Sequence, residues 1–253
     1  MEDIKILSRG ERLKLLRNKL NLKQQELAGK KFSKNYISMF ENNKRSINSV
    51  NALYLARKIN KIAGQRGKDI NVTPSYFLKC EADLAVEKCE EWLLEVESNL
   101  KLSEYHINVN LYKTILISSE YDLFHFRGKA LFLKGINSFN DKRPVCAMTQ
   151  ILDSIIYFAR ENNFFAIKEV YKNIGIILFN QQSLSEAIIF FNLCNSLIKS
   201  GILKNFKYDT ELIYYQALCY HKLGQNDIAG RIVENNYEKS EMLMDLHKTI
   251  NKD

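Results

Sequence analysis

Apolar residues recur at helical spacing along almost the whole chain. Near the start, Leu13, Leu16 and Leu20 lie three and four positions apart, which places them on one face of a helix. Ser8 and Glu11 precede this stripe in the order of a capping box, in which each side chain accepts a hydrogen bond from a backbone N–H. The pattern predicts a first helix that runs to about residue 19.

Two short helices across a tight turn follow. The pattern predicts a second helix over residues 24–30 and a third over residues 34–42. Ser33 is the expected N-cap of the third helix, and Ile37 and Phe40 are expected to face inward. Such a pair of helices forms a helix-turn-helix.

Two further elements complete a small N-terminal domain. A fourth apolar stripe starts at Leu53, and a fifth element follows Pro74, so five small helices can close one core. Residues 59–72 contain Gly64 and Gly67, and we expect this segment to be a loop or hinge.

The rest of the sequence is predicted to be helical almost throughout. We therefore expect an all-α chain with two domains, residues 1–80 and residues 81–253. In the second domain, amphipathic helices are predicted over residues 81–99, 103–118, 120–138, 145–161, 164–181, 184–200, 208–223, 225–235 and 238–250.

Small residues in the second domain recur at a fixed interval. The separation between Gly175 and Ala187 is the same as that between Ala217 and Ala229. Small side chains at such positions let two antiparallel helices approach closely. This spacing is typical of tetratricopeptide repeats.

A partial third unit is also visible. Gly128 and Gly135 repeat the interval between Ala217 and Gly224, although the next helix begins late, after residues 140–144. The three units together predict an α-solenoid of degenerate tetratricopeptide-like repeats, which has a concave groove along one side.

Composition and charge narrow the class of protein. The 253 residues are 46% hydrophobic and include only 2 prolines and 10 glycines, which favours helices over many-turned β structures. No apolar run approaches the roughly 18 to 20 residues of a membrane span, so we expect a cytoplasmic protein without a membrane partner.

The charge is distributed unevenly along the chain. Residues 1–72 contain 17 Lys and Arg against 6 Asp and Glu, a net charge of +11, whereas the rest of the chain has 20 against 23, a net charge of −3. Such asymmetry is typical of a nucleic-acid-binding module joined to a segment with another role.

The residue types that carry out catalysis or bind metals form no recognisable constellation. The 5 cysteines are scattered without a C-x-x-C pair, and the 4 histidines show no metal-ligand spacing. The sequence also lacks a Gly-rich phosphate loop and a G-x-S-x-G motif. We expect no disulfide framework, no metal, no cofactor and no enzymatic activity.

Residues 8–62 resemble a known DNA-binding domain. The positions that carry the resemblance are Gly10, Glu11, Arg12, Leu13, Arg17, Leu22, Gln24, Glu26, Leu27, Ala28, Ile37, Ser38 and the run from Glu41 to Arg45. In this register the chain is similar to the XRE-type (Cro/CI-like) domain, and the resemblance implies a structural ion pair between Arg17 and Glu41. The chain departs from the family at Lys23, where a serine or threonine cap is usual, and at Asn43, where glycine is usual. Asparagine tolerates the left-handed backbone conformation, so the second departure costs little.

The resemblance implies that the third helix lies in the major groove of DNA. Lys34 can donate to guanine O6 and N7, Asn35 can pair with adenine N6 and N7, and Gln24 at a helix start suits a phosphate. Lys44 and Arg45 suit the DNA backbone, although any of these residues can also be an ordinary solvated side chain. The full set of predicted DNA-binding residues is Gln24, Ser33, Lys34, Asn35, Tyr36, Ser38, Lys44 and Arg45.

A second set of candidate residues follows from the solenoid geometry. Side-chain amides can bind a peptide backbone, and Lys or His can bind a carboxylate. Each residue in the set named next can also be simply exposed or packed in the core. The predicted peptide-binding residues are His125, Lys129, Phe132, Lys172, Ile176, Phe179, Asn180, Tyr214, Leu218 and His221.

The combination of the two domains resembles the RRNPP regulators (PlcR- and Rgg-like), Gram-positive transcription factors that sense short imported peptides. Only eight residues lie between Ala28 and Ile37, where the common XRE pattern has nine, and the PlcR-like members share this shorter turn. The resemblance implies a quorum-sensing regulator that binds a double-stranded DNA operator and a short signalling peptide. A ligand-independent repressor whose helical half only dimerises or recruits a protein is the alternative, and a helical scaffold or an enzyme is a third possibility.

A twofold dimer is also predicted, because one helix-turn-helix covers only a few base pairs. The last helices are the expected interface. Their candidate residues are Ile232, Val233, Tyr237, Leu243 and Leu246.

Overall fold

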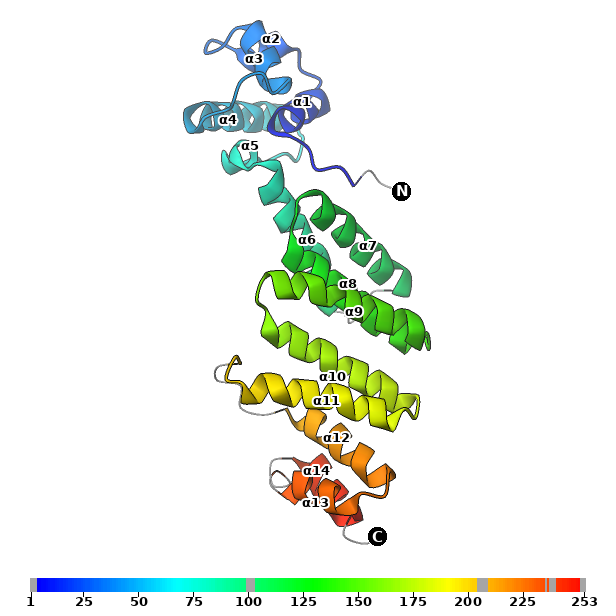
Figure 1. Ribbon diagram of the computed structural model, residues 1–253. Helices are drawn as coiled ribbons and strands as arrows, with labels where there is room; N and C mark the ends of the chain where they lie inside the picture. The colour runs from blue at the N-terminus through cyan, green and yellow to red at the C-terminus, as the bar shows by residue number, and fades with distance from the viewer. Residues whose placement is uncertain (1–3, 99–102, 204–208, 235, 237–239, 251–253) are drawn as a thin grey trace. The chain divides into compact units, whose positions relative to one another are not determined.

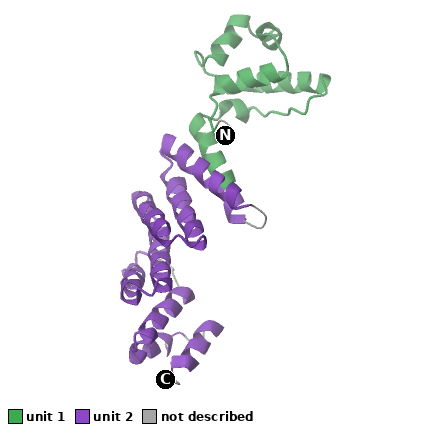
Figure 2. Ribbon diagram, turned by 90° about the vertical axis from the view of Figure 1, so that its right-hand side faces the viewer, with its two compact units in different colours: residues 1–92 green, residues 93–253 purple. Residues whose placement is uncertain are grey.

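Every regular element in the described part of the chain is a helix, which confirms the all-α prediction (Figure 1). The computed structural model describes residues 4–98, 103–203, 209–234, 236 and 240–250. Contacts divide the chain into two compact units, Met1–Trp92 and Leu93–Asp253 (Figure 2). The chain passes from one unit to the other within helix α6 (Glu81–Ser98). The domain boundary between residues 80 and 81 stays a prediction.

Besides the start of α6, the described part of the first unit contains five helices, in the predicted order. They are α1 (Arg9–Lys19), α2 (Gln24–Ala28), α3 (Lys34–Glu41), α4 (Ser49–Gln65) and α5 (Ser75–Leu78). The second helix is shorter than expected because Gly29 takes a φ of 61° and ends it. The predicted inward residues Ile37 and Phe40 are buried in one core with residues of α1, α2, α4 and α5.

Local side chains explain where the helices of the first unit begin. The Ser8 N–H donates to Glu11 Oε2 at 2.9 Å, and the Glu11 N–H donates to Ser8 Oγ at 3.3 Å, so the predicted capping box is present. Ser33 Oγ accepts from the Tyr36 N–H at 3.2 Å, as expected for an N-cap. At α2 no serine or threonine caps the first turn, but Glu26 accepts the backbone N–H of residue 23 at 2.6 Å, which is the other hydrogen bond of a capping box.

The structure corrects the expectation that residues 59–72 form a loop or hinge. Helix α4 continues to Gln65, because the apolar stripe of the helix extends to Ala63, which is buried. The chain that returns from α4 is fastened to it: Asn60 Nδ2 donates to the Val72 carbonyl at 2.9 Å, and the Val72 N–H donates to Asn60 Oδ1 at 2.8 Å. Gly64 is therefore helical, and the segment is a short anchored loop rather than a hinge.

In the residues that the structure describes, the second unit consists of α6 from residue 93 and eight further helices. They are α7 (Glu104–Glu120), α8 (Phe124–Asn140), α9 (Pro144–Arg160), α10 (Phe164–Asn180), α11 (Leu184–Lys199), α12 (Thr210–Lys222), α13 (Asn226–Glu234) and α14 (Glu241–Ile250). Each helix from α7 to α14 packs against the next one in the chain (Figure 1). None of the described helices is long and apolar enough to cross a membrane.

Five consecutive helices of this unit start at a constant interval. Helices α7 to α11 begin at residues 104, 124, 144, 164 and 184, and three residues separate each helix from the next. The middle residue of each connection has a positive φ, and the residue after it donates its N–H to a carbonyl five positions earlier, which closes a Schellman motif. The residues with positive φ are Asp122, Lys142, Asn162 and Gln182. The helix predicted to start at residue 120 starts at residue 124, because this turn carries no glycine to reveal it.

The pair of helices α8 and α9 is repeated by α10 and α11. The separation between Gly135 and Ala147 equals that between Gly175 and Ala187, and each residue occupies the same position in its hairpin. The alignment of Gly135 with Gly224 is wrong, because Gly135 lies inside α8 whereas Gly224 lies in a loop with a φ of 73°. A tetratricopeptide repeat has a period of about 34 residues. These hairpins are longer, since they begin at residues 124 and 164, and the tetratricopeptide assignment stays a prediction.

Glycine permits the closest helix contacts in these hairpins. A Cβ atom built on Gly135 would lie 3.0 Å from the Ala147 carbonyl oxygen and would overlap Ile151. A Cβ atom built on Gly175 would lie 2.8 Å from Cδ1 of Phe191, which occupies the position equivalent to Ile151. The side chains of Ile151 and Phe191 are fully buried, so they have little room to move away.

We predict that Gly175→Ala destabilises the second unit by about 1–3 kcal/mol, because the added methyl group overpacks the α10–α11 contact. Gly230→Ala is the matched control, because Gly230 is also helical but faces open space. The control should gain about 0.5–1 kcal/mol from the higher helix propensity of alanine. Urea denaturation followed by circular dichroism measures both effects, and equal stability changes in the two variants would contradict the prediction.

Candidate nucleic-acid interface

A buried ion pair fixes the third helix of the first unit against the first. Arg17 Nε donates to Glu41 Oε1 at 2.5 Å, and Arg17 Nη2 donates to Glu41 Oε2 at 3.1 Å. Arg17 also donates to the Leu22 carbonyl at 2.8 Å. The Glu41 side chain is only 2% exposed, so the pair lies inside the unit. The structure thus contains the ion pair that the family resemblance implies.

The second helix joins the same carboxylate. Gln24 Nε2 donates to Glu41 Oε2 at 2.8 Å, so α1, α2 and α3 all meet at Glu41. This bond occupies one donor of the Gln24 amide. A phosphate contact by Gln24 stays a prediction.

The first turn of α3 presents polar side chains to solvent. Ser33, Lys34 and Asn35 are exposed. Within the part of the chain that the structure describes, neither Lys34 nor Asn35 has a hydrogen bond or an ion pair through its side chain. Their donors and acceptors can therefore meet base edges without breaking a contact inside the protein.

Tyr36 and Ser38, on the same helix, are partly buried. The Tyr36 ring stacks on Phe32 with 5.3 Å between centroids and meets Phe40 edge-on at 4.9 Å. The Ser38 carbonyl accepts a hydrogen bond from Asn42 Nδ2 at 2.8 Å. Tyr36 thus contributes to the core beside any contact with DNA.

The segment after α3 is bound back to the start of α1. Asn43 takes a φ of 54°, which confirms that asparagine adopts the left-handed conformation here. Its Oδ1 accepts the Gly10 N–H at 2.9 Å, and its Nδ2 donates to Ser8 Oγ at 2.8 Å. Sequence reasoning missed this bridge, although an amide in place of the usual glycine was its signal.

The two cations that are predicted to bind the DNA backbone, Lys44 and Arg45, follow Asn43 in the chain. Lys44 is exposed. The Arg45 guanidinium lies 4.2 Å from the centre of the Tyr36 ring, so it is held over the first turn of α3. The structure thus brings Arg45 and Tyr36 together beside Lys34 and Asn35.

In the second unit, the predicted ligand Lys172 belongs to a partly buried cluster of charges. Its ammonium group contacts Asp209 at 3.3 Å, Glu169 at 3.1 Å and Glu211 at 3.0 Å. Lys168, whose side chain is 1% exposed, contacts Asp209 at 2.5 Å and Glu169 at 2.6 Å. We call these five residues the α10–α12 ion cluster. Its two ammonium groups and three carboxylates leave a net charge of −1.

The α10–α12 ion cluster is stabilised by its own members. Burial alone lowers the pKa of the Lys172 ammonium, but the carboxylates of Asp209 and Glu169 outweigh burial and raise that pKa above its ordinary value. Burial raises the pKa of Asp209, but the hydrogen bonds from Lys168 and from the Leu212 N–H bring it below its ordinary value. Both groups are therefore charged near neutral pH.

All the other predicted peptide-binding residues contact further residues of the chain. Asn180 Nδ2 donates to the Ile176 carbonyl at 2.8 Å, and Lys129 contacts Glu97 at 2.8 Å. Phe132, Ile176 and Phe179 pack against the main core of the second unit, and Tyr214 and Leu218 pack against the core of its last helices. His125 Nδ1 lies 3.4 Å from Glu161, and His221 Nδ1 lies 2.8 Å from Asn226 Oδ1.

A hollow of about 660 Å³ between α11, α12 and α13 contains none of the predicted peptide-binding residues. The residues that line it are Asn195, Lys199, Ile213, Gln216, Ile228, Arg231, Ile232 and Asn236. Sequence reasoning missed this hollow because it depends on how three helices meet.

The structure corrects the set of residues predicted to form the dimer interface. Val233, Leu243 and Leu246 are buried in one core with α12, so they hold the last helices of the chain together and are not available to a partner. Ile232 is partly buried beside them, and Tyr237 lies outside the described residues.

Comparison with protein families supports the geometry of the first unit. Residues 13–61 match the helix-turn-helix family model, which covers α2, α3 and most of α1 and α4. Comparisons with curated proteins and with solved structures found no match. Residues 13–61 are thus a helix-turn-helix of the XRE type, the kind of domain with which transcriptional regulators bind DNA. The described residues contain no group of His, Cys, Asp and Glu side chains that could hold a metal ion.

We predict that Lys34→Ala and Asn35→Ala each cost about 1–3 kcal/mol of operator binding and relax the preference for one base pair. Lys44→Ala should instead weaken binding to all sequences alike and reduce the salt dependence, because a phosphate contact carries no sequence information. Gel-shift titrations at several salt concentrations, on an operator selected from random DNA, measure both effects. Unchanged operator affinity in the Lys34 and Asn35 double variant would refute the assignment.

Proposed function

We propose that this chain is a sequence-specific transcriptional regulator whose helical repeats bind a short signalling peptide and thereby change its affinity for an operator. The observation that carries the DNA-binding part is the first turn of α3. There, Lys34 and Asn35 are exposed and without partners in the described part of the chain, on a helix fixed by Glu41. The net charge of +11 in residues 1–72 supports attraction to the phosphate backbone.

A homodimer is part of this proposal. Two helix-turn-helix units held at a fixed spacing can bind half-sites about 34 Å apart, or a multiple of that distance. The interface lies outside the buried residues Val233, Leu243 and Leu246. Binding to an operator also requires the regulator to share a compartment with the chromosome.

The peptide-binding part of the proposal depends on the hairpins of the second unit. Side-chain amides recur between neighbouring helices: Asn195 Nδ2 donates to Gln216 Oε1, and Gln216 Nε2 donates to Asn192 Oδ1, both at 2.9 Å. Amides of this kind can exchange their mutual bonds for bonds to a peptide backbone. Partly buried aromatic residues such as Phe179 supply apolar contacts on α10.

The α10–α12 ion cluster changes the role of Lys172 in the proposal. Its ammonium is neutralised by three carboxylates, so it does not attract the carboxylate of a peptide. Instead, Lys172 and Lys168 hold Asp209, which caps α12 by accepting the Leu212 N–H at 3.1 Å. The cluster thus connects α10 to the start of α12. Ile176, Phe179 and Asn180 remain the residues of α10 that we assign to the peptide.

A peptide acts as a switch only if it binds one arrangement of the dimer better than another. A tenfold change in operator affinity requires a preference of about 1.4 kcal/mol. One or two side-chain contacts supply a difference of this size.

The alternative function is a repressor that needs no ligand. One observation favours it: Lys172, Lys129, Asn180 and His221 all have partners within the chain. In this alternative the second unit only dimerises or recruits a protein.

Calorimetry distinguishes the two functions. Full-length protein is titrated with synthetic peptides encoded next to the gene, and Asn180→Ala is compared with Asn173→Ala. Asn173 is the matched control, because it lies on the same helix and also donates to the carbonyl four positions earlier. We expect Asn180→Ala to weaken peptide binding about tenfold, equivalent to about 1.4 kcal/mol, and Asn173→Ala to leave it unchanged.

The other outcomes are equally informative. Binding that survives Asn180→Ala would move the peptide site elsewhere, with the hollow between α11 and α13 as the next site to test. If no peptide binds while operator binding is normal, the ligand-independent repressor is the correct function.

A further inference from the structure

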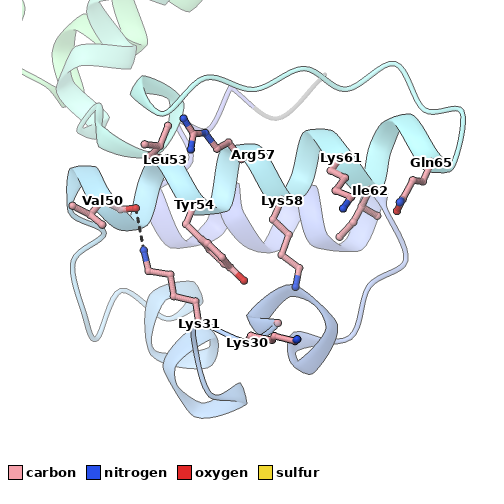
Figure 3. Close-up of a pocket in the computed structure, with 11 residues that line it drawn as sticks. Lys30, Lys31, Val50, Leu53, Tyr54, Arg57, Lys58, Lys61, Ile62 and Gln65 are labelled. Atoms are coloured by element: carbon pink, nitrogen blue, oxygen red, sulfur yellow. Dashed lines mark hydrogen bonds between the residues drawn. The ribbon is translucent and has the colours of Figure 1, made fainter.

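A groove of about 740 Å³ runs along α4 in the first unit, beside the turn that joins α2 to α3 (Figure 3). We call it the α4 groove. On α4 its lining recurs every three or four positions from Val50 to Gln65, so one face of the helix forms its whole length. At about 1.5 Å per residue this face spans about 22 Å, which equals about four turns of a helix.

The rim of the α4 groove is strongly basic. Five cationic side chains line it, and none of the described lining residues is acidic. The cations are Lys30, Lys31, Arg57, Lys58 and Lys61. Apart from Lys31, none of them forms an ion pair or a hydrogen bond through its side chain with another described residue. Partial burial lowers the pKa of the Lys58 ammonium, because burial disfavours the charged form. An anion bound beside Lys58 would favour the charged form again.

The floor of the α4 groove is apolar. Val50 is 66% exposed and Leu53 is 39% exposed, although both are large hydrophobic residues. Tyr54 and Ile62 continue the floor and are partly buried. Exposed apolar residues that are contiguous and rimmed by charge are typical of interaction sites.

The groove is already formed in the free protein. The Tyr54 hydroxyl donates to the Ala28 carbonyl at 3.1 Å. Lys31 Nζ donates to the Val50 carbonyl at 3.3 Å (Figure 3). The Lys31 ammonium also lies 5.0 Å from the centre of the Tyr54 ring. At Gly29, which has a φ of 61°, a Cβ atom would overlap the ends of Lys58 and Tyr54. These contacts hold α4 and the turn at a fixed separation.

We propose that the α4 groove is a docking site for an acidic amphipathic helix of a partner protein. The apolar side of such a helix covers Val50, Leu53 and Ile62, and its carboxylates meet the ammonium and guanidinium groups of the rim. Charge complementarity selects an acidic partner, because the charged residues among the described lining are all cations. The apolar floor favours a protein helix over DNA, because phosphate groups gain nothing from contact with Val50 and Leu53.

The test uses full-length protein and a fluorescein-labelled designed peptide. The peptide is long enough for about four helical turns. It carries leucine along one stripe and glutamate on both sides of that stripe, and the control peptide carries glutamine in place of every glutamate. Fluorescence anisotropy measures the affinity of both. We expect the acidic peptide to bind at least about tenfold more tightly than the control peptide, and the difference to shrink as salt rises.

Two variants assign the binding to the groove. Arg57→Glu with Lys61→Glu should weaken the acidic peptide at least about tenfold. Lys14→Glu with Lys19→Glu is the matched control, because it makes the same charge change at exposed positions of α1, and it should have an effect of less than about threefold. Val50→Ser with Leu53→Ser should also weaken binding, and it leaves the charge unchanged.

Several results would overturn the proposal. One is failure of the acidic peptide to bind wild-type protein. Another is an equal loss of affinity for the acidic peptide in the Arg57/Lys61 and Lys14/Lys19 variants. A larger loss of operator affinity in the Arg57/Lys61 variant than in its control would assign the groove to DNA phosphates instead. Loss of a dimer only in the Arg57/Lys61 variant, seen by light scattering, would assign it to a second copy of the chain.

Discussion

The buried carboxylate of Glu41 is the point on which the first unit depends. A carboxylate that is 2% exposed is stable only if charged or polar partners replace the water it has lost. Those partners are Arg17 of α1 and Gln24 of α2, so α3 cannot rotate or slide without leaving a charge unpaired. The amide of Asn43 adds a second attachment, from the end of α3 back to the start of α1. The direction in which Lys34 and Asn35 point is therefore set by contacts made elsewhere in the unit.

In the second unit, the packing of the helices depends on small residues that let facing helices approach closely. Gly135 and Gly175 allow Ile151 and Phe191 to pack directly against the facing helix backbone, at equivalent positions of successive hairpins. The three-residue connections keep successive helices antiparallel without glycine, because each positive-φ residue is followed by a Schellman hydrogen bond. Regular helix length and regular connections therefore reinforce one another. The α10–α12 ion cluster continues this order across the longer connection that precedes α12.

Local features of the fold were predictable from the pattern of residues, whereas most long-range features were not. The exception is the Arg17–Glu41 pair, which the family resemblance implied. The capping box of Ser8 and Glu11, the cap at Ser33 and the inward side of Phe40 each depend on residues within a few positions. The sequence pattern predicts too short an α4, because Gly64 is typical of a break, whereas its neighbour Ala63 is held by tertiary packing. For the site, the sequence placed Lys34 and Asn35 on an exposed turn, but it could not show that Lys172 meets Asp209, which lies far along the chain. The α4 groove was equally hidden, because it forms only where α4 meets the turn before α3.

A double-mutant cycle shows whether the Arg17–Glu41 pair positions the helix that binds DNA. Arg17→Met, Glu41→Leu and the double variant are compared for the free energy of unfolding and for operator affinity. Each single variant leaves a buried charge without its partner, so we predict a loss of about 3–5 kcal/mol of stability together with weaker operator binding. The double variant should recover most of both losses and keep the operator preference of the wild type. Single variants with wild-type stability, or a stable double variant that no longer binds the operator, would show that this ion pair does not position α3.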